Sequence, residues 1–201
     1  MTNTPPIVVG ITGASGAPYA VRLLQALTAA HRPVSLIVSK YGMRLLATEA
    51  GIGSMDALRD TVGIDAWASY VEVFSNDDRG AAPASGSAKT SGMIVCPCSM
   101  GTLSAIAVGA SRSLIERAAD VTLKEQRKLV LVPRETPLSA IHLGNMLRLT
   151  RAGAVVMPAA PGFYHRPKEI SDLVDFMVAR MLDHLGVEQN LVSRWEGERR
   201  D

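Results

Sequence analysis

Short runs of aliphatic residues recur along the chain, and most of them are apolar throughout instead of alternating with polar positions. These runs predict strands at residues 7–11, 34–38, 71–74, 93–96, 129–132 and 154–157. Strands that are apolar on both faces are typical of a parallel sheet with helices on both sides. We therefore expect an α/β fold, a three-layer α/β/α sandwich with a Rossmann-like or flavodoxin-like, mainly parallel sheet.

Helical periodicity is clearest near the C-terminal end of the chain. Residues 170–185 place apolar side chains at the i, i+3, i+4, i+7 positions of one helix face, and Gly186 is a suitable stop signal. Thr136-Pro137 predicts the start of another helix, because a capping hydroxyl before a first-turn proline favours initiation. The pattern shows no internal repeat and no linker, so we expect one domain over residues 1–201.

Residues 76–92 interrupt the alternation of strands and helices. The segment is rich in hydroxyl residues and glycine and has no periodicity. A connection this long inside a compact domain is usually a lid, a binding loop or disorder, and we predict a mobile functional loop. The charged residues 196–201 are predicted to form a frayed tail.

The charge balance narrows the class of protein. Among 201 residues, 21 Lys and Arg face 19 Asp and Glu, a net charge of +2 that is too small for a main partner such as nucleic acid or an anionic membrane. No apolar run approaches the ~20 residues of a spanning helix. Residues 1–6 lack the basic start and apolar core of a secretory signal, so we expect a cytoplasmic protein.

Cysteine and histidine usage argues against a metal site. Cys96 and Cys98 supply two ligands at most, and the 4 histidines are scattered without a metal-ligand spacing. We therefore expect no metal. Cys96 is predicted to be a core residue, and Cys98 a turn residue near the ligand.

Small and hydroxyl residues follow three of the predicted strands. They lie in the turns 12–16, 39–40 and 97–102, and Arg134 follows the fifth strand. Ligands of α/β sheets bind beyond the carboxyl ends of the strands. Free N–H groups at the helix starts there form anion sites. Three such turns and one cation together favour a phosphorylated ligand.

Two details favour a mononucleotide such as FMN over NAD. Gly10, Gly13 and Gly16 do not form the G-x-G-x-x-G motif of dinucleotide sites. The second strand ends in Ser39-Lys40, where a dinucleotide fold usually places an acidic residue for the ribose.

Another set of candidate residues is dispersed along the chain. Taken singly, each is more often a solvated surface residue than a site residue, and periodicity does not bring them together. The set comprises Glu49, Arg117, Lys124, Glu135, Tyr164 and Arg180.

Several longer segments follow one another in a recognisable order. They read GITGASGA at 10–17, ASGS at 84–87, CPCS at 96–99 with GT at 101–102, IERAADV at 115–121 with KE at 124–125, LVPRETP at 131–137 and PAAPGFY at 158–164. Together they closely resemble the UbiX-type flavin prenyltransferases, formerly called 3-octaprenyl-4-hydroxybenzoate carboxy-lyases. The resemblance spans residues 7 to 195 and is therefore far more specific than any single motif.

The resemblance implies an activity and its partners. Reduced FMN and dimethylallyl phosphate would give prenylated FMN, carrying the dimethylallyl group on N5 and C6, and inorganic phosphate. The product is the cofactor of UbiD-type decarboxylases, for example in ubiquinone biosynthesis. The family is metal-independent, and its members form dodecamers with active sites at subunit interfaces.

The resemblance also assigns roles to residues of this chain. FMN would be held by Gly13, Ala14, Ser15, Ser39, Ser99, Met100, Gly101, Thr102 and Arg134. The donor phosphate would be bound by Lys124, Arg134, Tyr164 and Arg180, supported by Ser85 and Arg117. The catalytic residues would be Ser15, Glu49, Lys124, Glu135 and Tyr164, with Glu49 and Glu135 managing protons.

Two positions depart from the family pattern. Met100 stands where many members have a hydroxyl residue, and we expect its backbone N–H to serve the ligand instead. Arg79 lies near a position that is apolar or aromatic in some relatives, so we expect the loop to pack differently against the prenyl chain.

Two alternative functions are considered beside the flavin prenyltransferase, one in the same superfamily and one without catalysis. An FMN-dependent cysteine decarboxylase of the same superfamily would need a P-x-M-N-x-x-M-W segment, a catalytic His and a Cys on a flap. This chain has PAAP at 158–161, and residues 76–92 contain no Cys. A non-catalytic flavin-binding subunit would tolerate the loss of Glu49, Lys124, Glu135 and Tyr164, and all of these are present.

Overall fold

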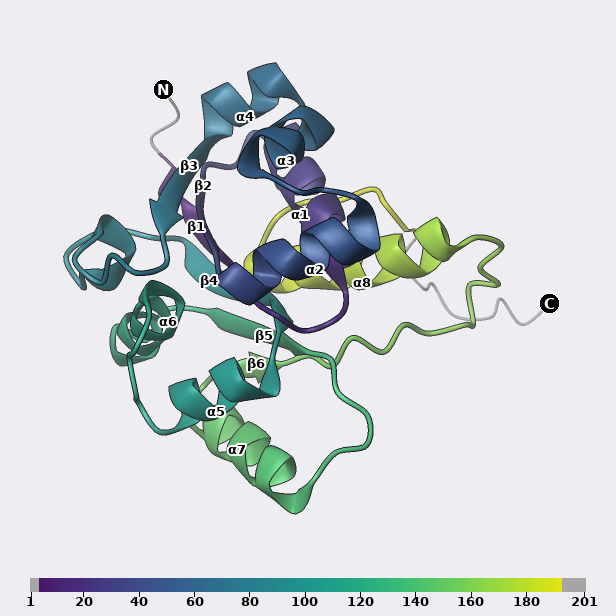
Figure 1. Cartoon of the computed structure of the whole chain (residues 1–201). Coiled ribbons are helices and arrows are strands. Elements are labelled where there is room, and N and C mark those ends of the chain that lie inside the picture. The colour runs from purple at the N-terminus through teal and green to yellow at the C-terminus, as the bar shows by residue number, and fades with distance from the viewer. Residues whose placement is uncertain (1–3, 193–201) are drawn as a thin grey trace.

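The computed structural model describes residues 4–192 of the chain. Six strands form one sheet in the order β3-β2-β1-β4-β5-β6 (Figure 1). The strands are β1 (Ile7–Ile11), β2 (Val34–Val38), β3 (Val71–Ser75), β4 (Gly92–Cys98), β5 (Leu129–Pro133) and β6 (Val155–Val156). Because every neighbouring pair is parallel, all of the carboxyl ends lie at one edge of the sheet.

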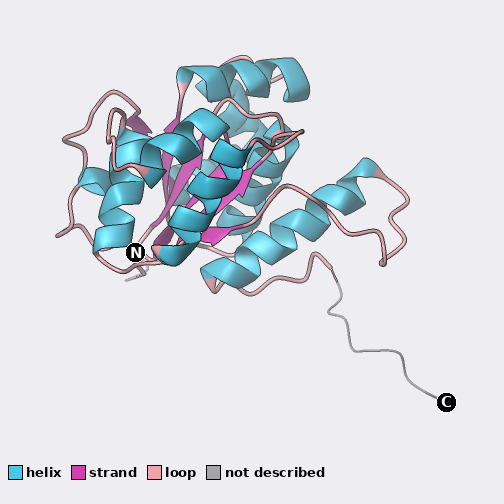
Figure 2. Cartoon of the chain, turned by 90° about the horizontal axis from the view of Figure 1, so that it is seen from below, coloured by secondary structure: helices cyan, strands magenta, loops and turns pink. Residues whose placement is uncertain are grey.

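Helices cover both faces of this sheet (Figures 1 and 2). One hydrophobic cluster includes side chains of α1 (Ala17–Ala29), α2 (Lys40–Ala50), α3 (Met55–Val62), α4 (Ile64–Tyr70) and α8 (Ile170–Leu185). The other includes side chains of α5 (Met100–Ala107), α6 (Leu114–Lys124) and α7 (Ala140–Arg151). The predicted three-layer sandwich is confirmed, and the strand order is that of the Rossmann fold.

The central strand β1 shows why the sequence has apolar runs without polar alternation. Ile7, Val9 and Ile11 pack into the cluster of α1 and α8, whereas Val8 packs into the cluster of α5 and α6. This is the pleat of a strand, whose successive side chains point to opposite faces. Since both faces are covered, every residue of β1 is buried. By contrast, β3 at the edge of the sheet is largely exposed or half-buried.

The predicted strands are present, but β4 extends further than the sequence suggests and includes Pro97 and Cys98. The prediction that Cys98 is a turn residue near the ligand is wrong, because its side chain is fully buried in the cluster of α5 and α6. Burial raises the pKa of the Cys98 thiol to about 12, so it stays protonated. Cys96 is buried on the other face of the same strand, as predicted.

The predicted helix start at Thr136-Pro137 is also wrong. α7 begins at Ala140, and its N-cap is Ser139, whose Oγ accepts the backbone N–H of His142 at 3.2 Å. His142 Nδ1 in turn accepts the N–H of Ser139 at 3.3 Å, which completes a capping box. The hydroxyl of Thr136 donates to the carbonyl of its neighbour Glu135 instead.

Residues 76–92 form a long connection that lies beside α6 and contains a short 3₁₀ helix, η1 (Ala82–Ala84). Pro83 and Ala84 are buried there, whereas Arg79 is exposed. The mobility of this loop and the single-domain assignment stay predictions. The predicted tail at 196–201 lies outside the described residues.

Ser139→Ala is expected to lower the free energy of unfolding by about 1 kcal/mol, because the start of α7 loses its capping oxygen. Thr136→Ala is the matched control and is expected to change it by a few tenths of a kcal/mol. Urea unfolding followed by circular dichroism at a fixed protein concentration measures both. Equal losses in the two variants would contradict the assignment of the cap.

Candidate functional site

A pocket of about 350 Å³ opens at the carboxyl edge of the sheet. It lies at the ends of the neighbouring strands β1 and β4, between which the order of strands along the sheet reverses direction. This switch point is where α/β sheets bind ligands. Its lining comes from the ends of β1, β2, β3 and β4 and from the start of α6: Thr12, Gly13, Ser39, Tyr41, Asn76, Ser99, Gly101, Thr102, Arg112, Ser113, Ile115 and Glu116. Five of the predicted FMN residues therefore share one pocket: Gly13, Ser39, Ser99, Gly101 and Thr102.

Thr12 ties the two strands together at the floor of this pocket. Its side chain is almost completely buried, and Oγ1 donates to the carbonyl of Pro97 at 2.8 Å and accepts the N–H of Ser99 at 2.7 Å. The end of β1 is thereby held against the last turn of chain before α5. From the sequence, Thr12 was expected only as part of a turn of small residues, and this cross-link was not predicted.

Three helices begin at the pocket, and each starts with a serine N-cap. The cap oxygens accept backbone N–H bonds: Ser39 from Gly42 (3.0 Å), Ser99 from Thr102 (3.3 Å) and Ser113 from Glu116 (3.3 Å). The amino end of a helix carries partial positive charge. The pocket therefore suits an anionic group, and its residues fit the phosphate of a mononucleotide such as FMN.

Gly13 is required by the close approach of α2. A Cβ at this position would overlap Tyr41 Cβ, so a larger residue would push the start of α2 away from the pocket. Ala14 and Met100, two other predicted FMN residues, have buried side chains. The Met100 side chain packs in the cluster of α5 and α6, so the role of its backbone toward a ligand stays a prediction.

The amino end of α1 is occupied by a carboxylate of the chain itself. Glu49 Oε2 accepts the N–H groups of Gly16 at 2.8 Å and Ala17 at 2.9 Å. Partial burial raises the pKa of Glu49, but these two bonds, a bond from the Ser15 side chain and the charge of Arg134 outweigh it and lower the pKa. The structure thus brings Ser15, Glu49 and Arg134 together, with the carboxylate ionised at neutral pH.

Arg112 and Glu116 form an ion pair at the edge of the pocket. This pair was not predicted from the sequence. Glu116 is 6% exposed, and its carboxylate accepts the Arg112 backbone N–H at 2.7 Å and Nη2 at 2.9 Å. Burying a carboxylate without a partner is costly, so this pair fixes the turn before α6. Its i, i+4 spacing at the start of a helix was the available signal.

Three of the predicted donor residues lie on α6 and the loop beside it. Lys124 pairs with Glu125, and Arg117 Nη1 pairs with Asp120 Oδ2 at 2.7 Å. Ser85 follows η1, and its Oγ lies 2.9 Å from Ser87 Oγ. Each cation is thus held by an acidic neighbour along α6 or directly after it.

The remaining predicted residues lie on two loops that project from the body of the molecule and on α8 (Figure 1). Arg134 and Glu135 are exposed between β5 and α7. Tyr164 lies between β6 and α8, is 61% exposed and packs edge-on against Phe176 of α8 at a ring-centroid distance of 5.6 Å. Arg180, on the same helix, pairs with Asp183 at 3.2 Å.

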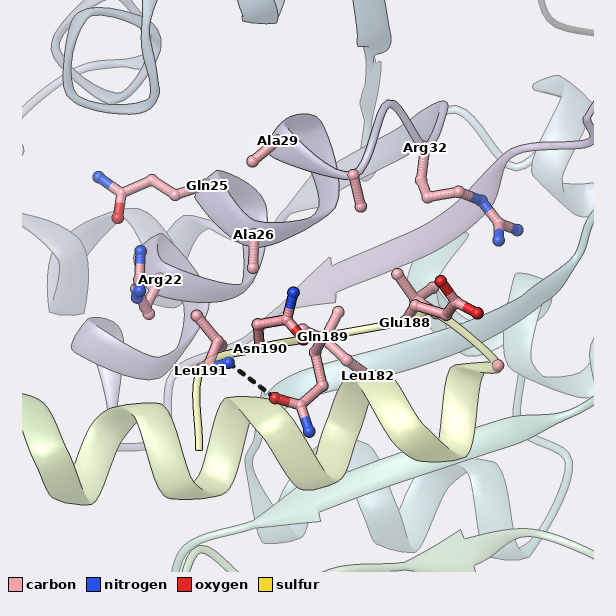
Figure 3. Close-up of a pocket in the computed structure, with 13 residues that line it drawn as sticks. Arg22, Gln25, Ala26, Ala29, Arg32, Leu182, Glu188, Gln189, Asn190 and Leu191 are labelled. Carbon is pink, nitrogen blue, oxygen red and sulfur yellow. Dashed lines mark hydrogen bonds between the residues drawn. The ribbon is translucent and has the colours of Figure 1, made fainter. Parts of the chain in front are cut away.

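A larger cavity, of about 710 Å³, lies away from these residues (Figure 3). Arg22, Gln25 and Ala26 of α1 face Gln189 and the neighbouring residues that follow α8 across it. Its α1 lining continues to the end of that helix, toward the amino ends of the strands and away from the edge where parallel sheets bind ligands. It contains none of the predicted site residues.

Over residues 4–192, no group of three or more His, Cys, Asp or Glu side chains is arranged to hold a metal ion. The helices in that part of the chain are all too short or too polar to cross a bilayer.

The chain is similar to known proteins over nearly its whole length. A family model described as Flavoprotein matches residues 1–182. The flavin prenyltransferase UbiX of Pseudomonas aeruginosa is 50% identical over 201 residues, which covers 97% of this chain and 96% of that protein.

Two solved structures extend the similarity to three dimensions. AnUbiX (PadA1), in complex with FMN and dimethylallyl pyrophosphate, is 43% identical with a TM-score of 0.89, and the match covers 98% of this chain and 100% of that one. A dodecameric FMN-dependent UbiX-like decarboxylase from Escherichia coli O157:H7 is 44% identical with a TM-score of 0.88, covering 96% and 100%.

Thr12→Val is expected to lower the free energy of unfolding by roughly 1–3 kcal/mol, because the half-buried N–H of Ser99 loses its acceptor and the carbonyl of Pro97 loses its donor. FMN affinity is expected to fall with it, since Ser99 begins α5 at the pocket. Thr12→Ser keeps the hydroxyl and is the matched control. Urea unfolding and flavin-fluorescence titration check both effects, and equal behaviour of the Val and Ser variants would exclude the cross-link.

Glu49→Gln is expected to change how stability depends on pH. Because the folded pKa of Glu49 lies below its ordinary value, its charge contributes stability that is complete above about pH 4.3 and is lost as the pH falls through the lower, folded pKa. The stability difference between wild type and variant should therefore shrink on acidification. Unfolding at a series of pH values measures it, with exposed Glu72→Gln as the control, and a pH-independent difference would contradict the charge effect.

Proposed function

The chain belongs to the Flavoprotein family and, within it, to the UbiX flavin prenyltransferases, and from this we propose that it transfers a dimethylallyl group from dimethylallyl phosphate to N5 and C6 of reduced FMN, releasing inorganic phosphate. Prenylated FMN is the product. The protein is thus a prenyltransferase whose flavin is a substrate rather than a redox cofactor.

The observation that carries the mechanism is the ionised carboxylate of Glu49, which is held at the start of α1 beside the turn that contributes Gly13 to the pocket. Ser15 and the N–H groups of Gly16 and Ala17 hold it in place, two residues along the chain from Gly13 in the pocket. Because it is ionised at neutral pH, this carboxylate is in the form that can accept a proton from a ring nitrogen.

The pocket residues are assigned to FMN. The helix starts at Ser39 and Ser99 fit its phosphate, and Gly101, which has open space where a Cβ would lie, leaves room for close approach of the backbone. When bound, reduced FMN supplies the electron-rich N5 and C6 positions. Glu49 accepts the proton lost at N5 and then releases it to solvent, which restores the carboxylate.

The dispersed cations are assigned to the donor. Breaking the allylic C–O bond leaves negative charge on the departing phosphate, and positioned cations stabilise that charge as it develops. Lys124, Arg134 and Arg180 supply positive charge, and Tyr164 adds a hydrogen bond without charge. Ser85 and Arg117 support the same phosphate, while Glu135 serves the second proton transfer.

Assembly completes this arrangement. The segments that carry Arg134 and Tyr164 project from the body, where a neighbouring subunit can meet them (Figure 1). We infer that the chain forms a dodecamer, as the Escherichia coli relative does by its description, with donor residues of one subunit facing the flavin of the next. We further propose that the protein acts in the cytoplasm and passes prenylated FMN to a UbiD-type decarboxylase.

The test is an anaerobic incubation of the protein with reduced FMN and dimethylallyl phosphate, with the diphosphate in a parallel reaction. Mass spectrometry of the extracted flavin is expected to show a heavier product that carries the prenyl group, formed equally well with EDTA present. Unaltered FMN with decarboxylation of a cysteine-ending peptide would instead indicate the decarboxylase. Bound, unaltered FMN with no reaction would indicate a binding subunit.

Lys124→Ala supplies the site control for this reaction. We expect it to bind FMN with wild-type affinity and to lose at least about a hundredfold in turnover, because the leaving phosphate loses a cation. Lys128→Ala removes a nearby exposed lysine and should retain wild-type turnover. Loss of FMN binding in Lys124→Ala would instead assign that residue to the flavin or to the fold.

A further inference from the structure

Arg127 follows α6 and fastens the second half of the 76–92 loop. Its guanidinium donates three hydrogen bonds: Nη2 to the carbonyl of Gly86 at 2.6 Å, and Nη1 to the carbonyl of Ala88 at 2.7 Å and to Thr90 Oγ1 at 3.2 Å. The side chain is half-buried. Charged donors to backbone carbonyls make stronger bonds than neutral donors, so this is a substantial attachment.

The first half of the loop is attached to the other end of α6. Asn76 accepts the N–H of Leu114 on its carbonyl oxygen at 2.7 Å and that of Ile115 on Oδ1 at 3.2 Å. Between the two attachments, Pro83 and Ala84 are buried beside the helix. The loop and α6 are therefore held together at both ends, and Arg127 provides the attachment nearer to Lys124.

Gly86 is the point at which the loop meets the predicted donor site. A Cβ at Gly86 would lie 2.9 Å from Lys124 Nζ and would overlap Glu125 Oε1, so the backbone of Gly86 sits directly against this ion pair. The carbonyl of the same residue is the one that Arg127 binds at 2.6 Å. Ser85, a predicted donor residue, immediately precedes it.

We propose that Arg127 is a positioning residue for the prenyl donor: by fixing the carbonyls of Gly86 and Ala88, it holds Ser85 and Lys124 in the arrangement that receives the donor phosphate. The inference rests on the proposed function, since that function defines the donor site. Arg127 acts through the loop, because its guanidinium bonds go to Gly86, Ala88 and Thr90.

The planar shape of the guanidinium is what makes arginine suitable here. Two nitrogens of one rigid fork reach carbonyls two residues apart in the loop, whereas the ammonium of lysine is a compact point charge on a flexible stem. Arg127→Lys should therefore keep part of the attachment and Arg127→Ala should lose it.

The experiment compares Arg127→Ala and Arg127→Lys with wild type, and Lys128→Ala is the matched control because it removes a positive charge from the next residue. Hydrogen exchange of peptides covering 86–90 measures attachment of the loop, and steady-state kinetics measure the donor KM and kcat. For Arg127→Ala we expect faster exchange at 86–90 and a donor KM raised roughly tenfold, with the FMN Kd within about twofold of wild type. Arg127→Lys should fall between, and Lys128→Ala should match wild type.

Unchanged exchange at 86–90 in Arg127→Ala would overturn the attachment, and faster exchange with an unchanged donor KM would overturn the positioning role. A matching rise in the FMN Kd would overturn it as well, because the effect would then not be specific to the donor. If Arg127→Ala does not fold, the same comparisons on Arg127→Lys decide. A wild-type protein that forms no heavier flavin would refute the proposed function, while the exchange data would still decide whether Arg127 holds the loop.

Discussion

All strands of the sheet run in the same direction, and this constraint decides where the protein can bind a ligand. It delivers the last residues of every strand to one edge, so that Thr12, Ser39 and Ser99 meet although they are far apart in sequence. The strands stay parallel because helices bury both of their faces, which leaves the carboxyl edge as the place where polar groups gather. The hydrogen bonds of Thr12 with Pro97 and Ser99 then hold the ends of β1 and β4 in a fixed position relative to each other.

The helix starts at that edge bind different negative groups. The amino end of each helix favours negative charge, and the starts of α1, α2, α5 and α6 are all candidates for binding a ligand phosphate. Glu49 satisfies the start of α1, which leaves the starts of α2, α5 and α6 facing the pocket. The same bonds keep the carboxylate ionised. In the proposed mechanism, Glu49 therefore leaves the other helix starts to the phosphate and also serves as the base.

The layered fold could be predicted from sequence because its cause is local. Two-sided burial leaves apolar runs, and the left-handed conformation after α8 calls for Gly186, so strands and that helix end are readable. Contacts that join distant residues leave no such pattern: Glu49 binds the N–H of a residue 33 positions away. The helix start predicted at Thr136-Pro137 was wrong for a related reason. Hydroxyl residues that could cap a helix are common, and the tertiary fold determines that Ser139 is the one that caps α7. Cys98 misled because the buried strand continued through a proline.

Three of the predicted donor cations are held in ion pairs at the surface, and in the proposed function this arrangement suits a phosphate that must arrive and leave. Lys124, Arg117 and Arg180 pair with acidic residues on or next to their own helices, and all of these pairs are partly exposed to solvent. Such pairs contribute little stability, about 0–1 kcal/mol, so a doubly charged phosphate can share or replace the carboxylate partner at small cost. The pairs nevertheless keep the long side chains in defined positions before the donor binds. The Tyr164 segment projects from the body of the molecule instead, so in the proposed assembly its contribution to the donor site depends on the neighbouring subunit (Figure 1).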